Sequence, residues 1–105
     1  LMRSLTAIFV LCFVAVPTFA GDESRGIGAT IAAAAACEGF VIDLRAIERL
    51  VEERSASDPR FAAAVLSHVM ESTRLLSETR ANLPGDFATH CATMQSTVSG
   101  AGLGG

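Results

Sequence analysis

The fold of this chain depends on how one central stretch is interpreted, Cys37-Glu38-Gly39-Phe40-Val41-Ile42-Asp43-Leu44-Arg45-Ala46-Ile47-Glu48-Arg49-Leu50-Val51. Its apolar residues recur at spacings of three and four, which is typical of one face of an α-helix. No proline and a single glycine, Gly39, occur between Ile31 and Ala56, and the alanines at 32–36 favour helix as well. The sequence therefore predicts one helix from Ile31 to about Ala56.

Downstream of this helix, proline marks two further boundaries. Ser57-Asp58-Pro59 predicts a helix start, because aspartate caps helices and proline suits the first turn. A second helix of about 24 residues then ends at Pro84-Gly85, and Asp86 is expected to cap a third. The apolar stripe of the second helix comprises Phe61, Val65, Leu66, Val69, Leu76 and Leu83, and that of the third comprises Phe87, Cys91, Met94 and Val98.

These patterns indicate an all-α fold, because no stretch alternates with period two for long enough to form a strand. The expected architecture is a small up-down-up three-helix bundle, a helical domain over residues 31–98. Residues 21–30 are expected to be a flexible lead-in, with the glycines at 26 and 28 supplying flexibility, and residues 99–105 a disordered Gly-rich tail.

The first twenty residues have the features of a secretory signal peptide. Arg3 is the only charge before Asp22, an apolar run spans Leu5–Val16, and Thr18-Phe19-Ala20 supplies small residues at the two positions that a signal peptidase recognises. Cleavage is expected between Ala20 and Gly21. The alternative is a retained membrane anchor, although twelve residues extend only about 18 Å as a helix.

The chain of 105 residues has room for one domain. All eight basic residues are arginine and 11 residues are acidic, so the formal charge is −3 and nothing indicates a nucleic-acid partner or a polybasic membrane patch. An all-arginine basic set is typical of GC-rich bacterial genomes. Without residues 1–20 the charge is −4.

The mature chain keeps two cysteines, Cys37 and Cys91, and an even pair in an exported protein indicates a disulfide. Short turns make neighbouring helices antiparallel, so the first and third helices are expected to run in the same direction, with both cysteines near one end of the bundle. Two free thiols are the alternative.

Candidate chemical groups lie on the second and third helices. His90, Cys91 and Met94, with His68 and Met70, are ligand types suited to copper(I), but a disulfide-bonded Cys91 cannot ligate, and we expect no metal or cofactor. His68 and Glu71 lie one turn apart near Ser67 and Ser72, yet no third residue orients the histidine. We therefore expect no catalytic residues and no enzymatic activity.

The segment Cys37-Glu38-Gly39-Phe40, following a signal peptide, resembles the start of mature acid-activated periplasmic chaperones of the HdeA type. That resemblance implies a small all-helical fold with one disulfide to a cysteine about fifty residues later, which fits Cys91, and a role as an acid-stress periplasmic chaperone. The chain departs from that family in lacking lysine, tryptophan and tyrosine.

Elimination leads to the expected function. We expect a small exported non-enzymatic protein, periplasmic or secreted from a bacterium, that binds another macromolecule in the envelope. The partner is expected to be a protein and not a nucleic acid, and no stable membrane span is expected after cleavage. The two alternatives are the acid-stress chaperone and an accessory subunit of a secreted enzyme or toxin.

Overall fold

The computed structural model describes residues 23–105, which contain four helices and no strand. An N-terminal helix covers residues 23–36 of the described chain, and it is followed by α2 (Leu44–Ser57), α3 (Phe61–Asn82) and α4 (Pro84–Gly100). The all-α prediction is confirmed. The predicted signal peptide, residues 1–20, and its cleavage site between Ala20 and Gly21 lie outside the described residues.

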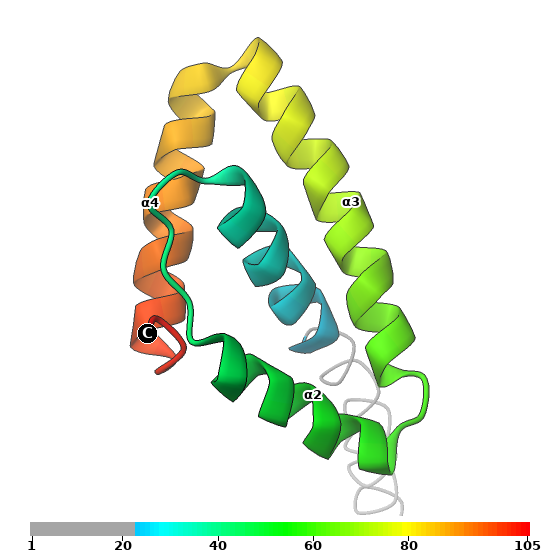
Figure 1. Ribbon diagram of the computed structural model, residues 1–105. Helices are drawn as coiled ribbons and strands as arrows, with labels where there is room; N and C mark the ends of the chain where they lie inside the picture. The colour runs from blue at the N-terminus through cyan, green and yellow to red at the C-terminus, as the bar shows by residue number, and fades with distance from the viewer. Residues whose placement is uncertain (1–22) are drawn as a thin grey trace, which may run out of the picture.

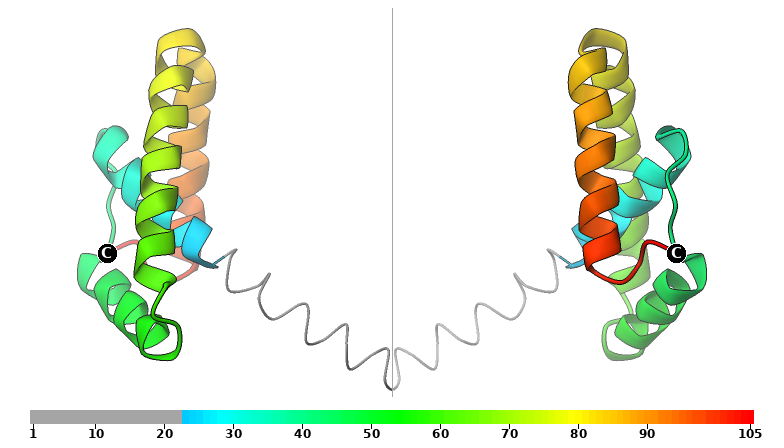
Figure 2. Two further views of the ribbon diagram at one scale, coloured as in Figure 1. Left: turned by 90° about the vertical axis from the view of Figure 1, so that its right-hand side faces the viewer. Right: turned by 90° about the vertical axis from the view of Figure 1, so that its left-hand side faces the viewer.

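The helices α3 and α4 form an inverted V, and the N-terminal helix lies between its two legs (Figure 1). Helix α2 crosses the open end of the V, and α3 packs against both α2 and α4. Seen from the side, the N-terminal helix crosses the α3–α4 pair obliquely (Figure 2). This helix and α4 run in opposite directions, so the predicted parallel arrangement of the cysteine-bearing helices is wrong.

The predicted helix from Ile31 to Ala56 is in fact two helices, and the three-helix bundle is therefore corrected to four helices. Residues 37–43 interrupt it, and we refer to them as the linker. Gly39 adopts a positive φ of 74°, a left-handed conformation that favours glycine and commonly follows a helix end. The Asp43 carboxylate then accepts a hydrogen bond of 3.1 Å from the Ala46 N–H, so Asp43 caps α2.

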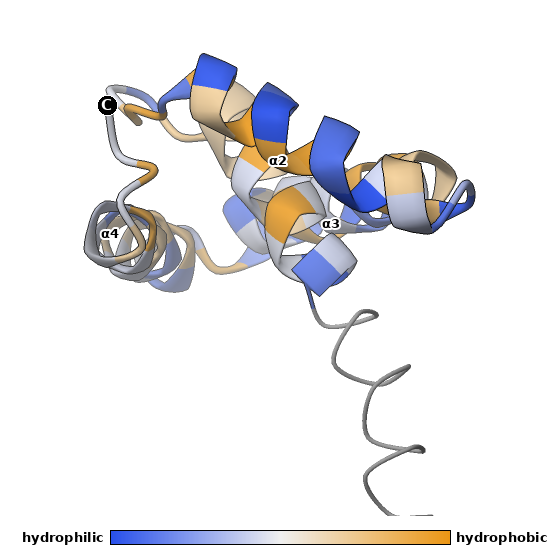
Figure 3. Cartoon of the chain, turned by 90° about the horizontal axis from the view of Figure 1, so that it is seen from below, coloured by the Kyte–Doolittle hydropathy of each residue, from blue (hydrophilic) through white to orange (hydrophobic). Residues whose placement is uncertain are grey.

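The core forms where the N-terminal helix, α2 and the start of α3 meet. Its buried residues are Ile27, Ile47, Phe61 and Val65, and the half-buried apolar side chains packed around them are Ile31, Ile42, Leu50, Val51, Val69 and Leu103. Helix α2 turns hydrophobic residues towards this core and hydrophilic residues outwards (Figure 3). Because Ile27 contributes to the core from a helix, the predicted flexible lead-in over 21–30 is wrong for residues 23–30.

The end of the chain also packs on the core instead of forming a disordered tail. Helix α4 continues to Gly100, and the Leu103 N–H then donates to the Val98 carbonyl at 2.9 Å. The Leu103 carbonyl accepts a 2.7 Å hydrogen bond from the Asp43 N–H. Residues 101–105 therefore lie against the linker just before α2, and the prediction of disorder over 99–105 is wrong.

The proline boundaries are confirmed with small shifts, although the predicted aspartate caps differ. Helix α3 begins two residues after Pro59, and the Asp58 side chain accepts from the Arg60 N–H at 3.0 Å. Helix α4 begins at Pro84 itself, so Asp86 lies inside its first turn and is not its N-cap.

A close contact between the N-terminal helix and α3 depends on Gly28. A Cβ atom at this position would lie 2.5 Å from the His68 Cβ and 2.9 Å from the Val69 nitrogen. Ala32, one turn later on the N-terminal helix, is fully buried. Gly28 therefore serves close helix packing and not flexibility.

Gly28→Ala is expected to lower the free energy of unfolding by about 1–3 kcal/mol, because the added methyl group overpacks the contact with α3. Gly26→Ala is the matched control, since a Cβ there meets no atom within 4 Å. It is expected to raise stability by about 0.4–1 kcal/mol. Urea denaturation of both variants measures the effects, and equal effects would contradict this role for Gly28.

Candidate functional site

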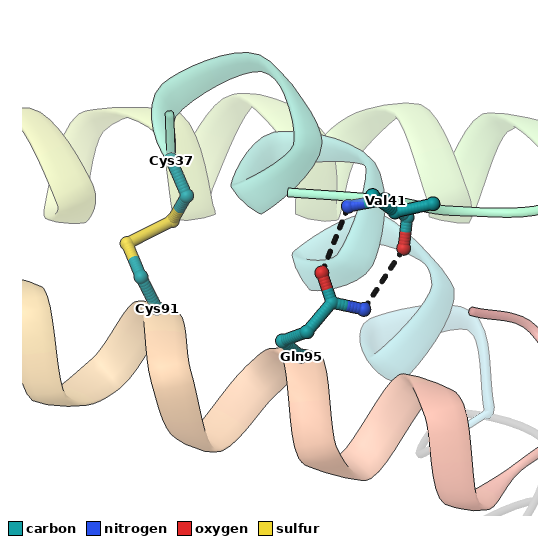
Figure 4. Close-up of a disulfide and its surroundings, with 4 residues drawn as sticks. All are labelled: Cys37, Val41, Cys91 and Gln95. Atoms are coloured by element: carbon teal, nitrogen blue, oxygen red, sulfur yellow. Dashed lines mark hydrogen bonds between the residues drawn. A yellow bond between two sulfur atoms is a disulfide. The ribbon is translucent and has the colours of Figure 1, made fainter. Parts of the chain in front are cut away.

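The disulfide joins the end of the N-terminal helix to the middle of α4. Cys37 and Cys91 are linked with their Cα atoms 5.8 Å apart, as Figure 4 shows, so the predicted pairing is present. Cys37 is only 5% exposed, and Cys91 is half-buried. The link therefore fixes the point where the chain leaves the N-terminal helix for the linker.

One turn further along α4, a glutamine holds the linker in place. The Val41 N–H donates to Gln95 Oε1 at 2.8 Å, and Gln95 Nε2 donates to the Val41 carbonyl at 3.0 Å (Figure 4). A primary amide can satisfy both backbone groups of an extended residue because it carries a donor and an acceptor side by side. The sequence gives no signal for this contact, since its partners are 54 residues apart.

Gln95→Leu removes both hydrogen bonds and is expected to cost about 1 kcal/mol of stability, because water replaces exposed bonds in part. Gln95→Glu still accepts from the Val41 N–H and is expected to cost less. Hydrogen exchange at the Val41 amide reports the contact directly. Unchanged exchange in Gln95→Leu would show that the amide does not hold the linker.

An open apolar cleft lies between α3 and α4 on the side of the N-terminal helix. Its volume is about 310 Å³, at the lower limit for ligand pockets. Helix α3 contributes four side chains to its lining, α4 two and the N-terminal helix one. They are Ser72, Leu75, Leu76 and Thr79 from α3, Asp86 and His90 from α4, and Ala29 from the N-terminal helix.

The two leucines of this cleft differ in exposure. Leu76 is 6% exposed and belongs to the packed interior, whereas Leu75 is 47% exposed. The Thr79 hydroxyl donates to the Leu75 carbonyl at 2.8 Å, so it is already satisfied within α3. The surface available to a ligand is therefore mainly aliphatic, with the polar groups of α4 at one side.

Asp86 and His90 lie one turn apart on α4, and this spacing places them on one face of the helix. Within residues 23–105 neither side chain has a hydrogen bond or an ion pair. The position of Asp86 in the first turn favours its negative charge, since the helix N-terminus is electropositive. The sequence did contain this signal, an acidic residue and a histidine four residues apart, but only the fold shows that both line a cleft.

The other candidate groups named from the sequence do not form a site together. His68 lies half-buried where Gly28 approaches α3, and Met70 is 66% exposed. Glu71 pairs with Arg74 at 3.1 Å, and Glu78 pairs with the same guanidinium at 3.0 Å. Met94 is half-buried on α4. Among the described residues, no three His, Cys, Asp or Glu side chains are close enough to hold a metal ion.

Two arginines have a raised pKa. For Arg54 the main cause is the hydrogen bond from its guanidinium to the Glu23 carboxylate, followed by the charge of that carboxylate. This pair joins α2 to the N-terminal helix. For Arg74 the causes are the hydrogen bond to and the charge of Glu71, followed by the same contributions from Glu78.

No helix of the described part of the chain is both long enough and apolar enough to span a membrane. The chain was compared with models of protein families, with curated proteins and with solved structures, and it matches none of them.

Proposed function

We propose that this chain is a small, exported, non-enzymatic helical protein that binds another protein through the cleft between α3 and α4. The observation that carries the proposal is the cleft itself, where the half-exposed Leu75 lies beside two polar groups without partners in the described chain, Asp86 and His90. Exposed apolar surface next to a few polar groups is the usual composition of a binding site.

The chemistry of the cleft supports binding over catalysis. In the described residues no hydrogen bond joins Asp86 to His90, or either of them to a hydroxyl that could act as a nucleophile. A catalytic base of this type needs a nucleophile and an orienting partner within hydrogen-bond reach. The cleft offers instead an apolar floor and a charged side.

Export to a bacterial envelope or beyond is supported by the disulfide, because such bonds persist in oxidising compartments and are rare in the cytosol. The signal-peptide features of residues 1–20 support it independently. An envelope protein partner is therefore the expected ligand of the cleft.

A photo-crosslinking amino acid at position 75 tests the proposal in envelope extract of the producing cells. We expect it to capture one partner, whereas the same amino acid at position 66 captures none. Leu66 is the matched control because it is also exposed, at 61%, and lies about two and a half turns earlier, on the opposite side of α3.

Equal capture at the two positions, or none at position 75, would contradict binding through the cleft.

Mass spectrometry of the crosslinked chain also tests export, because the mature protein is expected to begin at Gly21. Capture of an enzyme or a toxin chain would identify the protein as an accessory subunit.

A further inference from the structure

The cleft contains a negatively charged side chain, Asp86, that has no counter-ion within the described chain. None of the ion pairs of α3 includes Asp86: Arg74 pairs with Glu71 and Glu78, and the Arg80 guanidinium lies 5.6 Å from the centre of the Phe87 ring. Asp86 has no ion pair within the described chain, and its carboxylate lines the same cleft as Leu75 and Leu76.

We infer that the segment of the partner that enters this cleft carries an apolar side chain next to a lysine or an arginine. The apolar side chain contacts Leu75, Leu76 and Ala29, and the cation lies against the Asp86 carboxylate. The inference rests on the proposed function and specifies its partner.

Charge complementarity determines the sign of the partner group. An anionic side chain would face the unpaired carboxylate of Asp86, and a purely apolar segment would leave that carboxylate partly desolvated without a counter-ion. A basic group avoids both costs. The rest of the chain also has a net negative charge, because its acidic residues outnumber its arginines, and this charge likewise favours a basic partner.

The size of the cleft favours a side chain of a protein over a free small molecule. A volume of about 310 Å³ is at the lower limit for small-molecule pockets, which bury most of their ligand, and this cleft is open. Shallow apolar pockets of this kind instead accept single anchor side chains at protein interfaces, where a few residues supply most of the affinity.

Capped dipeptide amides test the inference with the full mature chain. Acetyl-Phe-Arg-amide and acetyl-Phe-Glu-amide are titrated at neutral pH while the backbone amide resonances of Ser72, Leu76 and His90 are followed by NMR. We expect the basic peptide to shift these resonances and to bind about two- to fivefold more tightly than the acidic peptide, as for a solvent-exposed ion pair. High salt should reduce the preference.

Asp86→Asn is expected to abolish the preference while leaving weak binding of both peptides. The matched control is Glu78→Gln, which removes one carboxylate from the same helix pair outside the cleft and should preserve the preference. Leu75→Asp should abolish the binding of both peptides. Asp86→Glu keeps the charge and should retain the preference for the basic peptide. Circular dichroism confirms that each variant is folded.

Each outcome separates the inference from the proposed function. Equal binding of the two peptides to the wild type, or an unchanged preference in Asp86→Asn, overturns the basic partner but leaves binding through the cleft intact. Tighter binding of phenethylamine than of the basic dipeptide would overturn the inferred protein segment in favour of a free small amine. No binding of either peptide overturns the inference, and if position 75 also crosslinks to nothing, the proposed function fails with it.

Discussion

Cys37→Ala combined with Cys91→Ala is expected to lower the free energy of unfolding by about 4 kcal/mol, because the disulfide closes a loop between residues 54 positions apart. In a domain of this size such a loss corresponds to a fall in melting temperature of about 15 °C or more. Few single interactions in the described chain contribute as much, since the buried cluster of the core has only four residues. Thermal denaturation followed by circular dichroism measures the change.

Reduction of the wild-type protein provides the control, because it breaks the bond without changing any side chain. The reduced protein and the double variant are expected to melt at similar temperatures. An unchanged melting temperature in both would show that the packing of α3 against α2 and α4 suffices without the link. Non-reducing peptide mapping establishes beforehand that the pair is oxidised.

The disulfide is one of three contacts that hold the linker in place. Cys37 starts the linker, Gln95 holds its middle at Val41, and the Leu103 carbonyl holds its end at Asp43. All three contacts come from the last fifteen residues or from α4. The C-terminal part of the chain therefore fixes the segment that separates the first two helices.

This arrangement explains why the sequence predicted one helix where the structure has two. The linker continues the apolar pattern of a helix, since Phe40 and Val41 fall at the spacing of three and four residues between Cys37 and Leu44. In the structure Val41 is exposed, and the residue of the linker that packs on the core is Ile42, which lies outside any helix. Local periodicity cannot separate these cases, although Gly39 followed by Asp43 was a usable signal for a helix stop and a new cap.

The cysteine pairing was predicted correctly although the predicted helix directions were wrong. An even number of cysteines indicates a disulfide whatever the order of the helices. The predicted helix directions, in contrast, assumed that the first helix is unbroken. Gly28 shows the same limit, because its role is visible only against His68, forty residues later. The proline boundaries of α3 and α4 were predictable because proline acts on its own turn.

The cleft could be predicted only in part. The spacing of Asp86 and His90 places them on one face of α4 from the sequence alone. One lining residue, Ala29, comes from the N-terminal helix, and the sequence had assigned residues 23–30 of that helix to a flexible lead-in. The wrong assignment of these eight residues left one side of the cleft out of the prediction.

Acid is expected to loosen the fold reversibly between about pH 4 and pH 2, because carboxylates in general are protonated in this range. The remaining charges are then seven arginines and two histidines, a total of +9 on the described chain. Repulsion of like charges of this size opposes compactness.

The arginines themselves do not limit stability in acid. The raised pKa of Arg54 and of Arg74 means that the stability linked to these two guanidinium groups is lost, as the pH rises, only in strong base, so neither group changes its charge between pH 4 and pH 2. The acid transition is therefore expected to result from the protonation of carboxylates in general. Because the disulfide survives at low pH, the product should be an expanded helical state tethered at Cys37 and Cys91, with exposed apolar surface.

Circular dichroism together with a hydrophobic dye measures this transition, with retained helical signal and increased dye fluorescence expected near pH 2. The double cysteine variant is the control, and it should lose helical signal as well. The result bears on the acid-stress chaperone alternative, because such a protein must expose apolar surface in acid in order to hold a client. A chain that stays compact and binds no dye at pH 2 eliminates that alternative, whereas binding through the cleft at neutral pH is unaffected by it.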